Sequence, residues 1–361
     1  MTDRLSAIRA NFDAWQVDAL LLTSAANRRW ASGFTGSAAH LLIGRDRAVL
    51  ATDSRYWERA GQEAPDYEVF QLRDGTDDMR NFLALAGGTR IGLEARHVTL
   101  AFQKQLAANP GIDWVALPAT IEPLRAVKSA DELAAIRAAA RLTDVAVALV
   151  PQLARPGVTE RAVAWELEKA MREAGAEGLA FDIIVASGPN SALPHHHPGD
   201  RALQAGDIVI VDLGAQVDGY KSDLTRSFYL GQTADDTFWS LYNTVSAAHQ
   251  AAIAGIYPGV TGKAVDALAR DLITAAGHGD HFGHGTGHGV GLEIHEEPRF
   301  SRLAEGAVIP AGSVMTVEPG IYLPGYGGVR IEDLLLVTPN GAEYLSGAPQ
   351  MPLIALPRSN S

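Results

Sequence analysis

Four carboxylates with clear chemical potential occupy matching places in two similar segments of the chain. Asp212 ends the run AGDIVIVD, and Glu318 ends the similar run AGSVMTVE 106 residues later. Asp223 and Glu332 follow them, with three extra residues in the second copy. If the two copies pack about a pseudo-twofold axis, all four acids meet at one centre. Such a centre suits a pair of cations.

The surroundings of these acids support that interpretation. The acids end or lie in segments that predict buried strands, and desolvating a lone carboxylate is very costly. Each acid therefore needs a partner of opposite charge. Lys221, Arg226 and Arg330 stand nearby in the sequence, so salt bridges to them are the alternative to bound cations. The repeat relation among all four acids favours the cations.

A glycine-rich segment with three histidines lies between the two acid-bearing copies. It reads FGHGTGHGVGLEIHEEP and contains His284, His288 and His295. Its glycines let the backbone approach a metal closely, and an imidazole can supply a nitrogen ligand. Because the chain has no cysteine, thiolate sites are excluded, and a metal would be held by His, Asp, Glu or backbone oxygen.

A second repeat predicts the helices that position these segments. The motif PGVT at 156–159 returns at 258–261, displaced by 102 residues. Each copy predicts a Pro-Gly turn, a threonine N-cap at Thr159 or Thr261, and a helix that ends at glycine. The second half of the chain is thus expected to consist of two related α/β halves.

The first part of the chain has a different pattern. Short apolar runs alternate there with helix-like segments and predict a small α/β domain. These runs are Ala19 to Leu22, His40 to Ile43, Arg47 to Ala51, Tyr67 to Leu72 and Arg90 to Leu93. A stretch with Pro118 and Pro123 then precedes a helical pattern from Asp131 to about Val150. We expect a first domain over 1–128 and a second over 129–361, as the length of 361 residues also favours two domains.

Composition narrows the function classes. The formal net charge of -12, without clustered Lys and Arg, argues against nucleic acid as a partner. No apolar stretch is long enough to predict a membrane span, and the start MTDRLSAIRANFDAW predicts an amphipathic helix rather than a signal peptide. We therefore expect a cytoplasmic globular protein with no membrane partner.

Several of these segments resemble a known family. VDLGAQVDGYKSDLTRSF, GTGHGVGLEIHEEP, TVEPGIY and GGVRIED are similar to the metal and substrate segments of the M24 metallopeptidases of pita-bread fold. This family includes Xaa-Pro aminopeptidase (aminopeptidase P), prolidase and methionine aminopeptidase. The resemblance covers nearly the whole chain. It implies a creatinase-type α/β domain followed by a pita-bread domain with an internal pseudo-twofold repeat.

The resemblance also implies roles for individual residues. Asp223 and Glu332 would bridge two metal ions, Asp212 would complete one site, and His288 with Glu318 the other. Glu318 would also shuttle the proton. Further catalytic and substrate-binding positions would be His195, in the segment GPNSALPHHHPG, together with His284, His295 and Arg330. His196 and His197 match no such position and are interpreted as loop residues.

The chemistry that these residues predict is peptide hydrolysis. Two divalent ions about 3.5 to 4 Å apart lower the pKa of a shared water and polarise the scissile carbonyl. Glu318 can take the proton of the water and deliver it to the leaving nitrogen, while imidazoles stabilise the developing oxyanion. Four carboxylates and one imidazole suit Mn²⁺, with Co²⁺ and Zn²⁺ as alternatives.

The substrate choice within the family rests on the first domain. Its presence disfavours methionine aminopeptidase, and the segment RRWASGFTGSAAHLLIGRDRAVLATDSRYWERA resembles the N-terminal domain of aminopeptidase P. We therefore expect cleavage of N-terminal Xaa-Pro bonds in peptides with proline at the second position, with prolidase as the alternative. Creatinase, which works without metal, and a non-catalytic peptide-binding relative fit the complete ligand set less well.

The resemblance further implies a homodimer or higher homo-oligomer. In that arrangement the first domain takes part in assembly and in selecting substrate length. The first domain of one subunit would form a wall beside the active site of another. We expect this wall to include the large rigid side chains of Trp30, Phe34, Tyr56 and Trp57, with a place in the core of the domain as the alternative.

Overall fold

The computed structural model describes residues 2–73, 77–304, 306 and 308–356. By its internal contacts the chain divides into two compact units, Met1–Arg125 and Ala126–Ser361. The expected boundary near Ser129 lies a few residues beyond this division. Among the described residues, no helix has both the length and the apolar character that a membrane crossing requires.

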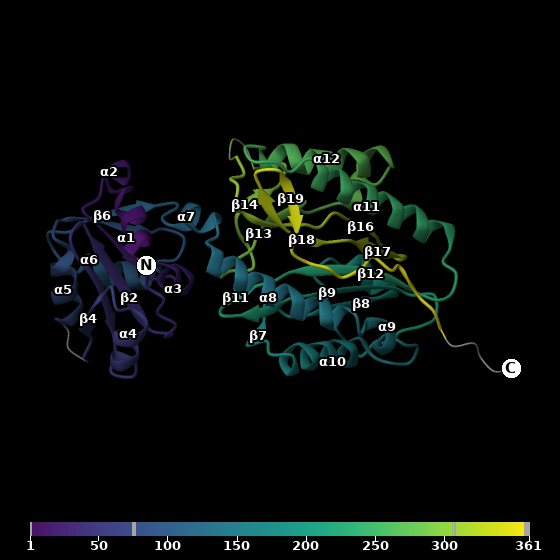
Figure 1. Cartoon of the computed structure of the whole chain (residues 1–361), viewed down its shortest axis with the longest axis horizontal. Helices are drawn as coiled ribbons and strands as arrows, with labels where there is room; N and C mark the ends of the chain where they lie inside the picture. Colours follow the sequence, from purple (N-terminus) through teal and green to yellow (C-terminus); the bar gives the residue numbers. More distant parts are fainter. Residues whose placement is uncertain (1, 74–76, 305, 307, 357–361) are drawn as a thin grey trace. The chain divides into compact units, whose positions relative to one another are not determined.

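The first unit is built on a mixed six-stranded sheet in the order β4-β3-β2-β1-β5-β6 (Figure 1). Its strands are β1 (Ala19–Leu22), β2 (Ala39–Gly44), β3 (Ala48–Thr52), β4 (Glu68–Gln71), β5 (Arg90–Glu94) and β6 (Asp113–Leu117). The five expected strands correspond to β1 to β5, whereas β6 was not predicted from the sequence. The sequence of β6 does not show the apolar run of a buried strand, because the strand is only partly buried and Leu117 is its one buried residue.

Helices and one 3₁₀ segment accompany this sheet. They are α1 (Thr2–Arg9), α2 (Phe12–Trp15), α3 (Ala25–Ser32), α4 (Trp57–Glu63), α5 (Asp78–Leu83), η1 (Ala84–Ala86), α6 (Leu100–Ala107) and α7 (Glu122–Ala126), the last of which crosses the division between the units. Trp30 and Phe34 are buried in this unit, so both are core residues. Tyr56 packs edge-on against Phe34 and, like Trp57, is partly exposed.

The second unit begins with a long helix and contains two larger sheets. Ser129 caps α8 through a capping box with Glu132, which fixes where the helix starts. The helices are α8 (Ala130–Val147), α9 (Val150–Leu153), α10 (Glu160–Glu173), α11 (Asp236–Ala254) and α12 (Gly262–Ala275), with 3₁₀ segments η2 (Gly188–Ala192) and η3 (Gly279–His281).

One larger sheet has the order β20-β12-β9-β8, and the other has the order β14-β13-β15-β18-β19. The first contains β8 (Ile184–Ser187), β9 (Ile208–Leu213), β12 (Leu224–Leu230) and β20 (Leu353–Ile354). The second contains β13 (Gly287–Gly289), β14 (Glu296–Phe300), β15 (Val314–Val317), β18 (Asp333–Thr338) and β19 (Gly341–Tyr344). Two small sheets complete the unit, one of β7 (Gly178–Leu179), β10 (Ala215–Val217) and β11 (Tyr220–Lys221), the other of β16 (Gly320–Leu323) and β17 (Gly327–Arg330).

Helices cover the outer faces of the two larger sheets (Figure 1). α8, α9 and α10 form one apolar core with β9 and β12, and α11 and α12 form another with β15 and β18. Thr159 and Thr261 cap α10 and α12 as predicted, since each hydroxyl accepts a hydrogen bond from the amide three residues later. Gly175 and Gly277 follow these helices with positive φ, a conformation that glycine adopts without strain. The repeat in the sequence is therefore a repeat of supersecondary structure.

Candidate active site

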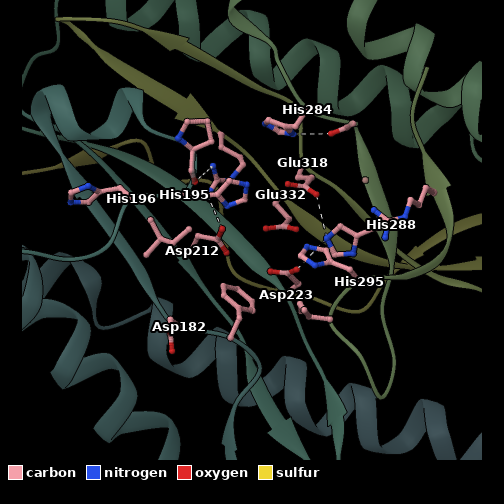
Figure 2. A pocket seen from close by; sticks show the side chains of 18 of the residues that line it. Asp182, His195, His196, Asp212, Asp223, His284, His288, His295, Glu318 and Glu332 are labelled. Atoms are coloured by element: carbon pink, nitrogen blue, oxygen red, sulfur yellow. Dashed lines mark hydrogen bonds and ion pairs between the residues drawn. The ribbon is translucent and has the colours of Figure 1, made fainter. Parts of the chain in front are cut away.

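Four strands deliver the four repeat-related acids to one place. Asp212 is the second-last residue of β9, and Asp223 directly precedes β12. Glu318 directly follows β15, and Glu332 directly precedes β18. The antiparallel registers Asp212↔Thr225 and Val317↔Asp333 keep the two acids of each half close together. Figure 2 shows that all four carboxylates converge.

His288 of β13 completes this group. Its Nε2 lies 3.6 Å from Asp223 Oδ2 and 3.4 Å from Glu318 Oε1. Single donor atoms of Asp223, His288 and Glu332 lie within 4.8 Å of one another, so these three residues could hold one metal ion. His288 Nδ1 contacts the Gly289 carbonyl oxygen at 3.0 Å, a partner that fixes Nδ1 as the protonated nitrogen and leaves Nε2 free as a ligand.

Burial makes this group of acids electrostatically unfavourable on its own. Burial, and then the nearby Glu332, raise the pKa of Asp223 well above its usual value. Burial and then Glu318 do the same for the pKa of Glu332. Burial raises the pKa of Glu318 to about 7, although Arg330 opposes the shift. Burial and then His295 lower the pKa of His288 to about 3, so its imidazole is neutral at physiological pH.

The donor set fits divalent metal ions. Within the described part of the chain, the buried Oδ1 of Asp212 has no hydrogen-bond partner, and the other acids are crowded enough to hold protons. Carboxylate oxygens and one neutral imidazole nitrogen are the ligands that hard and borderline divalent ions take. The sequence-predicted ligands Asp212, Asp223, His288, Glu318 and Glu332 all line one cavity of about 390 Å³.

The remaining predicted site residues lie on the walls of this cavity. His195 and His295 are exposed there, and the ring of His295 packs edge-on against His288 with centroids 4.4 Å apart. The next residue, Glu296, forms a buried ion pair with Lys128 at 3.1 Å, which anchors the segment that carries His295.

Arg330 and His284 are also brought to the cavity, but both are committed to protein partners. Arg330 donates from Nη2 to Asp212 Oδ2 at 2.6 Å and from Nη1 to the Tyr322 hydroxyl at 2.8 Å. His284 Nε2 contacts the same hydroxyl at 2.9 Å. Burial and then Arg330 lower the pKa of His284 to about 4, so this imidazole is neutral. The salt bridge that the sequence offered as an alternative thus exists at Asp212 and uses one of its two oxygens.

Sequence reasoning did not assign Tyr322, which joins Arg330 to His284. Tyr322 lies in the segment TVEPGIY, which carries part of the family resemblance. Its role is indicated by the burial of its side chain, and burial cannot be read from the sequence. His196 and His197 lie in a loop as predicted. His196, however, contacts the buried Glu160 at 2.8 Å, a residue that the sequence gave no reason to single out.

Comparison with known proteins fits this geometry. Residues 134–339 match the model of metallopeptidase family M24, and residues 4–127 match the creatinase/prolidase N-terminal domain. The chain belongs to metallopeptidase family M24. The expected fold, a creatinase-type domain followed by a pita-bread catalytic domain, is thereby confirmed. Members of this family use divalent metal ions, in agreement with the donor set described above.

Three relatives in the M24 family span the chain almost completely. An Xaa-Pro dipeptidase of Pyrococcus horikoshii is 36% identical over 96% of this chain and 97% of its own length. The structure of an Xaa-Pro dipeptidase from Bacillus anthracis is 39% identical, covers 98% of this chain and 99% of its own, and superposes with a TM-score of 0.94. The structure of an X-Pro aminopeptidase from Thermotoga maritima is 35% identical, covers 96% and 100%, and gives a TM-score of 0.86.

Proposed function

We propose that this protein is an Xaa-Pro dipeptidase that holds two divalent metal ions. The sequence favoured aminopeptidase P, with prolidase as the alternative, and the relatives named Xaa-Pro dipeptidase now favour that alternative. The relative named X-Pro aminopeptidase keeps aminopeptidase P as the second candidate. The substrate of an Xaa-Pro dipeptidase is a dipeptide with proline at its second position.

In this proposal the metal ions would be held by Asp212, Asp223, His288, Glu318 and Glu332. The bound ions supply Lewis-acid polarisation of the scissile carbonyl and activation of the attacking water. Mn²⁺ is our candidate ion because the set is rich in carboxylates. A non-catalytic relative would not need five donors of this kind, four of them buried, which cost stability when no cation is present.

Glu318 is suited to move the proton. It is less buried than Asp223 or Glu332, lies next to His288, and has a pKa raised to about 7. A group with a pKa near the working pH can both accept and release a proton efficiently. We assign it to take the proton of the attacking water and to pass it to the proline nitrogen as the peptide bond breaks.

The histidines and Arg330 have separate tasks in this proposal. His195 and His295 are exposed at the cavity and can donate to the developing oxyanion. Arg330 and His284 line the same cavity, but their contacts with Asp212 and Tyr322 suit them to orienting the carboxylate and shaping the site. The substrate therefore meets His195 and His295 first.

The observation that carries the dipeptidase proposal is an exposed, weakly paired cation on the cavity wall. Arg299 lines the cavity, its side chain is 49% exposed, and its partner Glu297 lies 3.6 Å away in an equally exposed pair. An exposed pair of this kind is weak, so Arg299 can turn to a new anion. A dipeptide carries its carboxylate one residue after the scissile bond, whereas a longer peptide has an amide there.

The test compares Ala-Pro with Ala-Pro-amide and Ala-Pro-Ala in the presence of Mn²⁺. We expect the highest kcat/KM for Ala-Pro. Arg299→Ala should raise KM for Ala-Pro about tenfold or more, as expected for loss of a charge-assisted contact, and leave Ala-Pro-amide unchanged. Arg302→Ala, an exposed neighbour that does not line the cavity, is the matched control. A preference for Ala-Pro-Ala would move aminopeptidase P ahead.

The first unit is proposed to support assembly and to limit substrate length. Trp30 and Phe34 are core residues, so only the partly exposed Tyr56 and Trp57 remain as aromatic candidates for a wall. Light scattering should give at least a dimer. A monomer with full selectivity for dipeptides would contradict this part of the proposal.

A further inference from the structure

A buried carboxylate outside the acid cluster holds the loop between β8 and β9. Glu160 is the first residue of α10 and is fully buried. Its Oε1 accepts hydrogen bonds from the Ser187 amide at 2.8 Å, the Ser187 hydroxyl at 2.7 Å and Asn190 Nδ2 at 3.0 Å. Its Oε2 contacts His196 Nε2 at 2.8 Å and accepts from the Gly199 amide at 3.2 Å. One side chain thereby ties four residues of the loop region to a helix.

This arrangement is fully satisfied. Burial by itself would raise the pKa of Glu160, but the hydrogen bonds from Ser187, Asn190 and His196 outweigh burial and lower it. The carboxylate is therefore ionised, and hydrogen bonds to an ionised acceptor are stronger than neutral ones. Of the partners of Glu160, His196 is an imidazole that also lines the cavity.

The residue between the anchored positions is His195. On one side of it, the Pro194 carbonyl oxygen accepts a hydrogen bond from Arg330 Nη1 at 3.2 Å. On the other side, His196 is held by Glu160. Figure 2 shows His195 beside Asp212, whereas His196 is set back from the acids. The exposed ring of His195 thus owes its place to contacts made by its two neighbours.

We infer that His196 is a positioning residue, which through Glu160 fixes the loop that presents His195 to the substrate. The inference rests on the proposed function, because it takes His195 to be a group that contacts the substrate. Without the His196 contact, the segment around His195 regains backbone freedom, and the imidazole spends less time in the productive position. A displacement of about 1 Å can lower catalysis by about 10²-fold.

The first experiment measures kcat/KM for Ala-Pro in three variants. His196→Ala should lower it by about 10- to 100-fold. His196→Gln, whose amide can donate to Glu160, should recover most of the loss. Asp200→Asn, in the same loop as His196, is the matched control. It removes a 3.0 Å ion pair with Arg161 of α10. Because both side chains of this pair are largely exposed, kcat/KM should change by no more than about twofold.

A double-mutant cycle separates positioning from general structural support. If His196 acts through His195, then His196→Ala in the His195→Ala background should lower kcat/KM by less than about twofold further. Fully additive losses would overturn the inference, as would wild-type activity in His196→Ala.

Hydrogen exchange tests the anchor without relying on activity. His196→Ala should speed exchange of the amides of residues 195–197, 199 and 200, including the Gly199 amide held by Glu160, and leave β8 and β9 unchanged. Unchanged exchange in this loop would overturn the inference. If the wild-type protein failed to hydrolyse Ala-Pro, the proposed function would fall, and the exchange result would still decide whether His196 holds the loop.

Discussion

The two repeat-related halves of the catalytic unit supply carboxylates in nearly the same way. In the first half, Asp212 lies in β9 and Asp223 directly precedes β12. In the second half, Glu318 directly follows β15 and Glu332 directly precedes β18. In both, an antiparallel strand pair places its two acids at one end, next to the other half.

The halves differ in what surrounds the acids. The second half adds the imidazole of His288 from β13, whereas β8 of the first half contributes the buried residues Ile184–Ser187 and no histidine. Hydrogen bonds also cross between the halves: Arg330 of the second donates to Asp212 of the first, and Thr225 of the first donates to Glu332 of the second at 2.7 Å. The repeat provides the acids, and each half orients an acid of the other, so the site exists only when both are packed together.

The largest effect should come from removing a shared acid. Glu332→Ala takes away the acceptor of Thr225 and a carboxylate proposed to be common to both metal ions. Loss of metal assistance is worth several kcal/mol, and each 1.4 kcal/mol is a factor of ten, so kcat should fall by on the order of 10³-fold or more. Turnover of Ala-Pro and metal content per chain check this together. Near-normal activity in this variant would break the assignment of Glu332.

Glu318→Gln tests whether the carboxylate of Glu318, in the second half, moves the proton. Gln keeps the size of the side chain but cannot take a proton, so turnover should fall by about 10²- to 10⁴-fold. Metal content is measured in parallel, because loss of a metal ion would add to the effect. A loss below about tenfold would place the proton acceptor elsewhere.

His195 and His295 compare the two halves directly, since one lies between β8 and β9 and the other between β13 and β14. His195→Ala and His295→Ala should each lower kcat by about 10²-fold, the scale for one oxyanion donor. Both variants should keep the metal content of the wild type. A metal-depleted variant would show that its histidine is a ligand, and our division between ligands and substrate-side groups would then be wrong.

Much of the architecture could be predicted because it follows from short sequence patterns, namely repeated segments, helix caps and apolar runs. The shared segments around Asp212 and Glu318 indicated the repeat, and Thr159 and Thr261 indicated where two helices begin. The apolar runs indicated five strands of the first sheet. These features depend on residues close together in the sequence, where strand and helix periodicity and capping chemistry act.

The unpredicted features depend on contacts between distant residues. Tyr322 meets His284 across 38 residues, and His196 meets Glu160 across 36. Nothing in the local sequence marks Glu160 as different from any other acid at the start of a helix, where such residues are favoured in any case. Likewise, the aromatic character of Trp30 and Phe34 suits both an interface and a core, and only packing places them in the core.

The smallest expected effect is a pH dependence that separates Glu318 from His288. In the metal-free protein the pKa of Glu318 is raised to about 7, so below that pH a proton must leave before a metal ion can bind. The pKa of His288 is lowered to about 3, so it is neutral from pH 5 to 8 and adds no such competition. The raised pKa values of Asp223 and Glu332 add to this competition, so apparent Mn²⁺ affinity should fall by about tenfold or more per pH unit below pH 7, as followed by calorimetry. An affinity that rises on acidification would contradict this assignment.

The most direct test of the account is a metal titration of the chelator-treated, metal-free protein. Bound Mn²⁺ per chain and hydrolysis of Ala-Pro are measured on the same samples, together with the melting temperature, which metal should raise because it binds the folded site. We expect two ions per chain at saturation and no activity before metal is added. Full activity in the metal-free protein, or no Mn²⁺ bound at this site even in excess Mn²⁺, would contradict the two-metal proposal.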